Sequence, residues 1–438
     1  MSNNSRNSLT ILSLIDAGNF GCIHLACKNG GIDDGLLYAV KTITPDPKFD
    51  YSHQHRICRN EFRTLKLVHD VPFFIQLKYA SKTRHAYHFV MDYILDGNLF
   101  NHLQAGVLTL KEMKVCCAEI ILAIEYLHRY RIVYRDLKLE NVLIAGDGHI
   151  LLTDFGLAQK INKNERLQGE AGTLAYFAPE MLSDNGHSFE VDWWSLGIVA
   201  FELLVGHSPF LSSSKRIDDQ THRSRIKNES PYLKKLSYLG PNAKSVMDFI
   251  QQLLIKNPAQ RLGAGHDGYE AVKKHAFFSQ LNWTMVKLKK YSCIERKQPG
   301  QYVKIRYTKH CELSLEEPKE NRRKEFYYVA PEFQEEDDFF GFTEDDISAL
   351  SSKIPLEAPM CNIQLRSDLL IVTNKPTEVI KQMILPKMTF NEALQENTAM
   401  IVDDDEPNDE NVPNRSDDDK VRRSNRTPKR NRRFSMIF

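Results

Sequence analysis

The sequence lacks any long uncharged apolar run, any paired-cysteine motif and any apolar leader at its N-terminus. No stretch of the 438 residues reaches the ~18 uncharged apolar residues that a membrane-spanning helix needs, and the opening segment MSNNSRNSLT is polar. The eight cysteines are scattered, with neither a Cys-x-x-Cys pair nor a Cys/His cluster, so we expect no zinc site and no disulfide framework. These absences favour a soluble intracellular protein in a reducing compartment, with no membrane partner.

Glycine and proline, at 21 and 18 residues, are too few for a collagen-like chain, and neither a sustained heptad pattern nor an internal repeat is present. Hydrophobic residues make up 42% of the chain, which is enough to fill a sizeable core. The 58 Lys and Arg residues nearly balance the 57 Asp and Glu residues. Because the chain is neither basic nor acidic throughout, we expect no direct nucleic-acid binding. We also expect a monomer.

Composition divides the chain into four segments. Residues 1–10 form a polar tail, and residues 11–278 alternate apolar strands with amphipathic stretches, which predicts a folded unit. Residues 279–345 are charged but contain scattered aromatic side chains. In residues 346–438 regular patterning mostly fails, and an acidic run is followed by a basic run. We expect this last segment to be mostly disordered.

The folded unit itself changes character along its length. Its first part contains strand-like segments such as LLYAVKTI and YHFVMDYI, with one helix expected around Arg59 to Val68. From Leu99 onward apolar residues recur at helical spacing. We therefore expect an α+β protein with a small β-rich lobe at about 11–92 and a larger α-helical lobe at about 97–278.

The segment YRDLKLEN concentrates three polar side chains that suit phosphoryl transfer. Asp136 could accept or orient a hydroxyl proton, Lys138 could neutralise charge on a transferring phosphoryl group, and Asn141 could bind a divalent cation. Any one of them is equally well explained as part of a polar loop after a helix. All three at this spacing favour the chemical interpretation.

The segment TDFG follows YRDLKLEN by a short interval and comes directly after the apolar run ILL. An acid at the end of a strand, here Asp154, suits a magnesium ligand that faces nucleotide phosphates, and Gly156 lets the backbone turn. Asp-Phe-Gly alone is a common turn. Its position after YRDLKLEN is what makes it informative.

Two further features lie upstream. The segment IDAGNFGCI places Gly18 and Gly21 between two expected strands, where backbone amides can approach phosphates, although a glycine-containing hairpin is the simpler explanation when it is taken alone. YAVK supplies Lys41 on an alternating strand, and Glu61 lies on the expected helix. An ion pair between Lys41 and Glu61 could hold the lysine against the α- and β-phosphates.

Together these segments resemble the protein-kinase signature set, in order and in context. FAPE, DWWSLG and NPAQRLG extend the resemblance over about residues 11–345. It implies a bilobal protein kinase fold that uses ATP and Mg²⁺, in which Glu180 pairs with Arg261 and Asp192 braces the catalytic loop. It also implies catalytic roles for Asp136, Lys138, Lys41, Glu61 and Thr173, and metal binding by Asn141 and Asp154.

Other motifs resemble one group of kinases in particular. YRD, DWWSLG, LNW and FFGFT look like the AGC group of serine/threonine kinases, and TDFGLAQ, LLYAVKTI and LENVLI are most similar to the N-terminal kinase domain of mitogen- and stress-activated and ribosomal protein kinases. FFGFT resembles the hydrophobic motif of the AGC C-terminal extension, here 279–345, in which two Phe dock into a small-lobe pocket. The resemblance implies a nucleotide site formed by Ile15, Gly18, Gly21, Ile23, Ala39, Lys41, Met91 (the gatekeeper), Asp92, Tyr93, Ile94 and Leu143.

The chain departs from this pattern where the nucleotide and the substrate would bind. Asp16 replaces the first glycine of the nucleotide loop and adds negative charge near the phosphates. Asn98 replaces the acid that binds a substrate arginine three residues before the phosphosite. Glu140 and Glu202 remain as substrate-binding residues, so we still expect protein substrates with basic motifs.

The activation segment, residues 157–172, contains no Ser, Thr or Tyr. The usual phosphoacceptor position is Gly169, and relatives pair a phosphate there with the arginine that corresponds to Arg135. We expect either constitutive activity, with Glu165 or Glu170 as a partial charge substitute, or control by another route. Thr173 should hydrogen-bond within the Asp136–Lys138 group.

The tail carries nine acids over residues 403–419 and eight basic residues over 420–434. Three interpretations of the basic run stay open: a nuclear-import signal, a solvated charge run without a specific role, or a docking peptide for an upstream mitogen-activated kinase. The regulatory candidates are Thr343, next to Glu344 in the place of the motif's closing aromatic residue, and Ser435, which follows two arginines.

We therefore predict an ATP-dependent serine/threonine protein kinase that transfers the γ-phosphate to Ser or Thr of substrates with Arg residues before the site, located in the nucleus, the cytoplasm or both. The alternative is a pseudokinase or nuclear scaffold that acts through its tails, which Asp16 and the bare activation segment favour. Five retained residues oppose the alternative, because a scaffold has no physical need for all of them: Lys41, Glu61, Asp136, Asn141 and Asp154.

Overall fold

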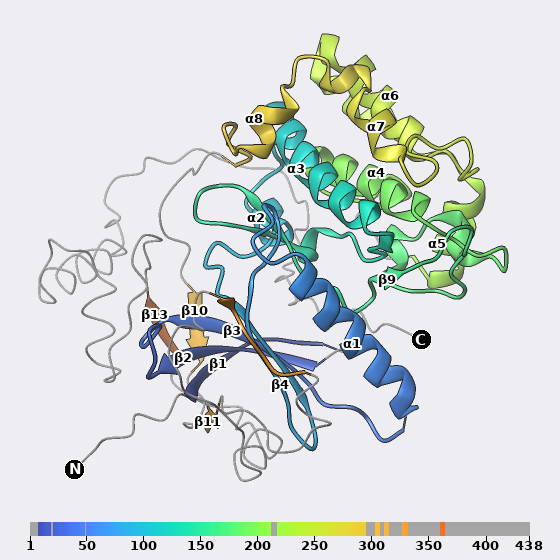
Figure 1. Cartoon of the computed structure of the whole chain (residues 1–438). Helices are drawn as coiled ribbons and strands as arrows, with labels where there is room; N and C mark the ends of the chain where they lie inside the picture. The colour runs from blue at the N-terminus through green and yellow to red at the C-terminus, as the bar shows by residue number, and fades with distance from the viewer. Residues whose placement is uncertain are drawn as a thin grey trace, which may run out of the picture. The chain divides into compact units, whose positions relative to one another are not determined.

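The structure is a computed structural model in which a β-sheet is followed by a helical region, so the expected small and large lobes are both present (Figure 1). The α+β class and the bilobal arrangement are confirmed. The described residues are 8–18, 21–48, 50–211, 217–294 and 326–331, together with the backbone of short strands at 303–306, 311–314 and 360–363.

The small lobe is built on a seven-stranded sheet. Its strands follow the order β11-β1-β2-β3-β5-β4-β12, and each neighbouring pair is antiparallel. This arrangement brings β3, the strand of Lys41, to the centre of the sheet. The strands are β1 (Ser8–Gly18), β2 (Gly21–Asn29), β3 (Leu37–Ile43), β4 (Leu77–Lys82), β5 (Tyr87–Asp92), β11 (Cys311–Ser314) and β12 (Tyr328–Val329).

The first strand begins at Ser8, inside the segment that the sequence predicts to be a polar tail. Asn29 at the end of β2 explains the difference. Its side-chain amide donates to Ser8 Oγ at 3.2 Å and to Thr10 Oγ1 at 2.8 Å. Leu9 lies between these two residues and is fully buried, so cross-strand hydrogen bonds and this apolar side chain together hold the segment in the sheet.

The helix of the small lobe, α1 (Tyr51–Leu67), also begins earlier than the expected Arg59. Its first turns are polar, but the Asp50 carboxylate accepts hydrogen bonds from the backbone N–H groups of Ser52 (3.1 Å) and His53 (3.2 Å). This N-cap satisfies backbone donors that a helix start leaves unpaired. Glu61 therefore lies well inside a long helix.

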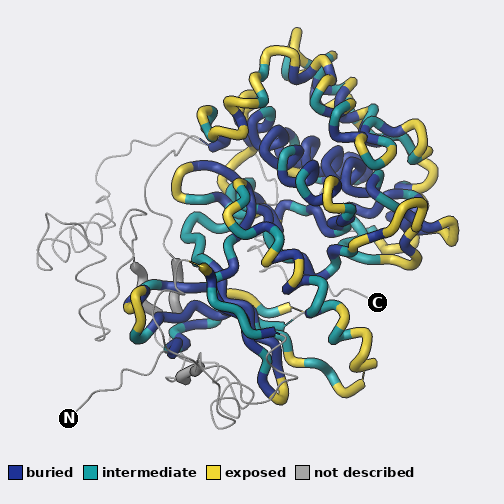
Figure 2. Tube along the Cα trace, in the orientation of Figure 1, coloured by how far each residue is buried: buried dark blue, intermediate teal, exposed yellow. Residues whose placement is uncertain are grey.

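The large lobe is organised around α3 (Leu110–Arg129) and α4 (Glu190–Val205), which are its most deeply buried helices (Figure 2). A reciprocal capping box between Thr109 and Glu112 fixes the start of α3. No helix among the described residues is long and apolar enough to cross a membrane. The other elements are α2 (Leu99–Gln104), α5 (Asp219–Asn228), α6 (Ala243–Leu253), α7 (Gly268–Lys273), α8 (Trp283–Lys287), the strands β6 (Ile132–Val133), β7 (Val142–Ile144), β8 (Ile150–Leu152) and β9 (Gln159–Lys160), and the 3₁₀ helices η1 (Leu139–Asn141), η2 (Leu174–Tyr176), η3 (Pro179–Leu182), η4 (Leu233–Asn242) and η5 (Ala276–Phe278).

Part of the C-terminal extension packs on the small lobe. Strand β12 pairs with β4, and the ring of Phe326 is fully buried, with its centroid 4.9 Å from that of Tyr87 and 5.5 Å from that of Phe62. The segment 339–343, which the sequence predicts to dock on this lobe, lies outside the described residues. The docking of that segment therefore stays a prediction, and the observed contact of the extension with α1 is the packing of Phe326 against Phe62.

One short strand lies within the segment predicted to be mostly disordered. It is β13 (Met360–Ile363), which pairs antiparallel with β10 (Val303–Arg306).

Candidate active site

Three charged side chains from three elements meet at Lys41. Its ammonium donates to Glu61 Oε1 at 2.6 Å and to Asp154 Oδ1 at 2.8 Å. Lys41 comes from β3, Glu61 from α1, and Asp154 from the turn after β8. The ion pair expected between Lys41 and Glu61 is thus present, and it is joined to the acid predicted to bind metal.

Burial and charge compete within this cluster. Burial disfavours the Lys41 ammonium, but Asp154 and Glu61 outweigh that cost and raise the pKa of Lys41. Burial raises the pKa of Glu61 to about 6, even though Lys41 opposes the shift. The pKa of Asp154 is lowered, because Lys41 overcomes the effect of burial. Glu61 and Asp154 therefore differ in acidity although they share one lysine.

The loop YRDLKLEN brings its three polar side chains together. Lys138 Nζ donates to Asp136 Oδ2 at 2.8 Å and to Thr173 Oγ1 at 3.3 Å. The Asn141 amide donates to Asp136 Oδ2 at 2.8 Å and to its backbone carbonyl at 2.9 Å. Burial raises the pKa of Asp136 to about 6, although Lys138 opposes the shift. Thr173 joins the Asp136–Lys138 group, as the sequence analysis expects.

The geometry of this loop is fixed by Asp192 on α4. Its carboxylate accepts hydrogen bonds from the backbone N–H groups of Tyr134 (3.0 Å) and Arg135 (2.8 Å), and lies 2.8 Å from His128 Nε2. Arg135 has a φ of 65°, a conformation that costs energy for a non-glycine residue. The bracing role expected for Asp192 is visible in these contacts, while His128 was not singled out from the sequence.

A second ion pair fixes the segment after the activation segment. Arg261 donates to both carboxylate oxygens of Glu180, at 2.6 Å and 2.9 Å, and both side chains are buried. This is the pairing that the sequence resemblance implies. A buried bidentate pair of this kind holds its two segments in one register.

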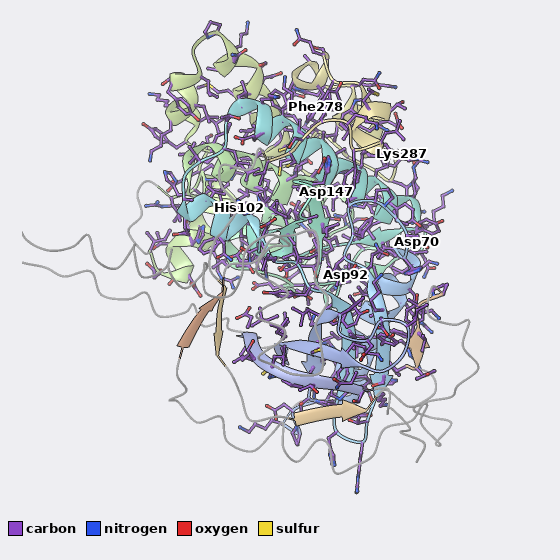
Figure 3. All side chains as sticks on the ribbon, turned by 90° about the vertical axis from the view of Figure 1, so that its left-hand side faces the viewer. Asp70, Asp92, His102, Asp147, Phe278 and Lys287 are labelled. Atoms are coloured by element: carbon purple, nitrogen blue, oxygen red, sulfur yellow. The ribbon has the colours of Figure 1, made fainter. Side chains whose placement is uncertain are left out.

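The residues predicted to form the nucleotide site come from neighbouring strands. In the sheet Ile23 lies opposite Lys41, and Ala39 lies opposite Met91. Leu143 on β7 forms an isolated bridge with Asn98, the residue that precedes α2. Asp92 ends β5, and Figure 3 shows it at the junction of the two lobes. The rest of the set lies on β1, on β2 and in the connection after Asp92: Ile15, Gly18, Gly21, Tyr93 and Ile94.

The two glycines of the nucleotide loop differ in what surrounds them. A Cβ on Gly21 would lie 2.1 Å from the backbone oxygen of Thr42, and its φ is 117°. A Cβ on Gly18 would meet nothing within 4 Å. Gly21 is therefore required by the close approach of β3, independently of any phosphate. Asp16, the departure in this loop, is exposed, and its carboxylate accepts a hydrogen bond from the N–H of Ala17 at 2.8 Å.

The two predicted substrate-binding acids sit in different environments. Glu140 is exposed, whereas Glu202 on α4 is 8% exposed and accepts a hydrogen bond from the Tyr176 hydroxyl at 2.7 Å. Burial raises the pKa of Glu202 to about 8, and the charge of Glu140 adds to the shift. Asn98 is occupied as the N-cap of α2, where it accepts from the N–H of Asn101 at 3.0 Å.

The activation segment corrects the expectation that Glu165 or Glu170 compensates for a missing phosphate at Arg135. Glu170 instead binds both terminal nitrogens of Arg223 on α5. Glu165 accepts from the backbone and side chain of Asn162. Arg135 donates to the carbonyl of Leu157 (2.9 Å) and to Gln159 Oε1 (3.1 Å). The segment is held by neutral acceptors and by α5. The regulatory candidates Thr343 and Ser435 lie outside the described residues.

Oxygen donors at Asp154 and Asn141 fit a magnesium ion. Asn141 uses its amide nitrogen on Asp136, which leaves the side-chain oxygen as its ligand atom. Magnesium is commonly bound by one or two protein side chains together with substrate phosphates. No group of three or more His, Cys, Asp and Glu side chains suited to a metal occurs among the described residues, so a closed all-protein site is not built there.

Residues that sequence reasoning missed include Arg223, His128 and Phe326. The aromatic run EFYYVAP around Phe326 stands out in a charged stretch of the sequence. The sequence does not indicate that this run packs against Phe62 and Tyr87. Arg223 and His128 carry no pattern of their own. Their roles depend on contacts with residues that are distant in the sequence.

Comparison with known proteins agrees with this fold. The profile of the protein kinase domain matches residues 9–278, and the chain belongs to this family. It is 40% identical over 291 residues to "Ribosomal protein S6 kinase alpha-4" of Homo sapiens, covering 65% of this chain and 37% of that protein. It is 36% identical over 275 residues to "Ribosomal protein S6 kinase alpha-3" of Homo sapiens (62% and 36%), and 35% identical over 274 residues to "Serine/threonine-protein kinase AtPK2/AtPK19" of Arabidopsis thaliana (62% and 55%).

These relatives confirm the resemblance to AGC-group kinases that the motifs indicate. The chain spans just over a third of the length of the ribosomal protein S6 kinases that it matches.

Proposed function

We propose that this chain is an ATP-dependent serine/threonine protein kinase. The observation that carries the proposal is the contact of Lys41 with both Glu61 and Asp154, across three elements, beside the group formed by Asp136 and Lys138. Each of these charges is costly to bury, and together they suit the binding and transfer of a phosphoryl group.

Each side chain has a role that follows from its position. Lys41 would hold the α- and β-phosphates, and Glu61 would keep Lys41 in place. Asp136 would orient the Ser or Thr hydroxyl and accept its proton, while Lys138 would balance the charge that spreads over the transferring group. When bound, Mg²⁺ supplies charge neutralisation at the phosphates, and Asn141 and Asp154 would hold it.

The substrates would carry basic residues before the phosphorylated Ser or Thr. Glu202 is buried next to Glu140 with only a neutral hydroxyl donor, Tyr176, so a cationic side chain at this place would supply the missing positive charge. Because Asn98 is engaged in capping α2, this pair would dominate recognition of substrate arginine.

A kinase assay on a basic peptide with Mg²⁺ and ATP tests this function. We expect Asp154→Ala to lower phosphate incorporation by about 10²-fold or more, because it removes the metal ligand and one partner of Lys41. The matched control is Asp147→Ala, which removes an exposed loop carboxylate that pairs with Lys289. Equal background incorporation by the wild type and by Asp154→Ala would favour a pseudokinase or scaffold.

The cellular location of the protein and its binding to an upstream mitogen-activated kinase are proposals that rest only on the basic run at residues 420–434. A nuclear-import signal at residues 420–434 would send the protein to the nucleus, in addition to any cytoplasmic pool. Replacing the arginines of this run with alanine in the full chain should abolish nuclear accumulation. A variant that stayed nuclear would refute the import signal. The two other interpretations of the basic run, a docking peptide and a solvated charge run, would then remain.

A further inference from the structure

A pocket of about 660 Å³ lies in the large lobe where η4 meets α6. Its walls come from these two helices and from the flanking segments 230–231 and 254–256. None of the residues that line it belongs to the set predicted to bind nucleotide, metal or substrate. Figure 1 shows α6 at the end of the large lobe that faces away from the small-lobe sheet. The pocket is therefore a feature separate from the candidate active site.

The lining combines apolar surface with positive charge. Leu233, Met247 and Ile255 line the pocket and are half-buried, so they leave part of their apolar surface accessible. Of the ten residues that line it, two are lysines, Lys234 and Lys256, and none is acidic. An apolar cavity with a cationic wall favours a ligand that has both a large apolar group and a carboxylate.

Lys256 is fixed in its position. Its ammonium donates to the backbone carbonyl of Ile226 at 2.5 Å, at the end of α5, and it lies 4.2 Å from the ring centroid of Phe210 and 4.9 Å from that of Trp194. These contacts order a normally flexible side chain before any ligand arrives. Lys234, by contrast, is exposed at the rim. One lysine is thus preorganised and the other is free to adjust to a ligand.

The surface around the pocket also combines positive charge with exposed aromatic rings. Between residues 223 and 256 there are seven Lys or Arg residues and two acids. Arg223 and Arg225 are paired with Glu170 and Glu229, which leaves five lysines and one acid, Asp248, outside these two pairs. Tyr232 and Tyr238, in and beside η4, are 49% and 60% exposed. Large exposed aromatic rings beside an apolar cavity mark surfaces that bind other molecules, and the positive field selects a negatively charged one.

We infer that this pocket binds an acidic peptide segment of a partner protein. One large apolar side chain of the peptide enters between η4 and α6, and its flanking carboxylates face Lys234 at the rim. A nucleic acid would satisfy the charge but not the apolar wall. Binding here requires no catalysis, so it holds or fails independently of the proposed kinase activity.

Fluorescence anisotropy on the full-length protein, without ATP, tests this assignment. The probe is a short fluorescein-labelled peptide with two Phe residues flanked by Glu and Asp, compared with the same peptide carrying Gln and Asn. We expect saturable binding of the acidic peptide and at least about tenfold weaker binding of the amide peptide. Lys234→Glu should weaken binding of the acidic peptide by at least about tenfold, because it reverses the charge at the exposed rim.

The matched control is Lys244→Glu, which makes the same charge change at an exposed position of α6 outside the lining. It should change the affinity by less than about twofold. Met247→Gln tests the apolar wall and should also weaken binding, with circular dichroism to check that it folds. If Met247→Gln does not fold, Lys234→Glu and its control decide the question.

Three results would overturn the assignment. The first is no saturable binding of the acidic peptide, and the second is an equal loss in Lys234→Glu and Lys244→Glu, which would show only general charge attraction. The third concerns the chain's own acidic segment, in which Glu335, Glu336, Asp337 and Asp338 precede two phenylalanines. If changing these four to Gln and Asn in the full chain tightens peptide binding by about tenfold or more, the occupant is this segment and not a partner.

Discussion

At the scale of single residues, the chemistry depends on carboxylates that the fold makes weakly acidic. Burial raises the pKa values of Asp136 and Glu61 to about 6. Asp154 moves in the opposite direction because its charge is balanced by Lys41. In the proposed mechanism these shifts separate a proton acceptor, Asp136, from a metal ligand, Asp154, whose lowered pKa favours the ionised form, although both residues are acids paired with lysines.

The pH dependence of kcat/KM follows from these shifts, because they belong to the protein without bound substrate. An acid with a raised pKa is ionised above that value, so Asp136 can accept a proton above about pH 6 and loses this ability as the pH falls through 6. Glu61 becomes protonated in the same range and then holds Lys41 less firmly. We expect kcat/KM to be constant near pH 7.5 and to fall by about tenfold or more per unit below pH 6.

Steady-state rates on a basic peptide between about pH 5 and pH 8 measure this profile, with circular dichroism at each pH to check that the protein stays folded. A flat profile in folded protein would contradict the assignment of Asp136.

The two glycines of the first hairpin make a matched pair for a stability test. Gly21→Ala places a Cβ 2.1 Å from the Thr42 oxygen at a φ of 117°, whereas Gly18→Ala meets nothing within 4 Å. We expect Gly21→Ala to lower the free energy of unfolding by about 2 kcal/mol or more, and Gly18→Ala to change it by less than about 1 kcal/mol. Urea unfolding measures both, and equal effects would disprove the steric argument.

At the scale of elements, α1 is the connection between the C-terminal extension and the candidate active site. Glu61 on this helix positions Lys41, and the adjacent Phe62 packs against Phe326. Because a helix moves as a rigid unit, packing at Phe326 should help to hold the ion pair. The activation segment is secured differently, through the contact of Glu170 with Arg223 on α5.

Removing the Phe326 ring tests this connection. Phe326 is fully buried between Phe62 and Tyr87, so Phe326→Ala should cost about 3–5 kcal/mol and increase hydrogen exchange along α1. Phe326→Leu keeps an apolar group in the site and should cost less than about 1.5 kcal/mol. Thermal unfolding and exchange mass spectrometry measure the two variants. If Phe326→Ala left the exchange of α1 unchanged, the extension would not support the helix.

At the scale of the whole molecule, the two lobes supply different parts of one site. Lys41 and Glu61 come from the small lobe, while Asp136, Asn141 and Asp154 come from the large lobe. Only the contact of Lys41 with Asp154 joins the two sets directly. A ligand that bridges the lobes should therefore stabilise the protein as a unit.

Magnesium and ATP should raise the melting temperature. At ligand concentrations about 100 times Kd the expected stabilisation is about 2.7 kcal/mol, which corresponds to a shift of several degrees. EDTA or Asp154→Ala should remove the magnesium-dependent part, whereas Asp147→Ala should retain it. Differential scanning fluorimetry of the full chain measures the shift. A protein that showed none would be a scaffold that does not bind nucleotide.

The family, the two-lobed fold and most of the candidate site could be predicted from the sequence. The reason is that motifs such as YRDLKLEN and TDFG carry their chemistry within a few residues, where spacing along the chain fixes the geometry. The sequence predicted the ends of helices and strands less accurately, because β1 and α1 both begin earlier than expected. Asn29 draws Ser8 into the sheet and Asp50 starts α1 in a polar stretch, and neither effect follows from hydrophobic periodicity.

The contacts between side chains that are distant in the sequence depend on how the chain packs. Glu170 contacts Arg223 rather than Arg135, and Phe326 fills the place against α1. The acidity of Glu202 was likewise undecided, because a raised pKa depends on burial and on the neighbouring Tyr176 and not on the residue type. Long-range contacts and desolvation are properties of the packed chain, and a linear pattern does not encode them residue by residue.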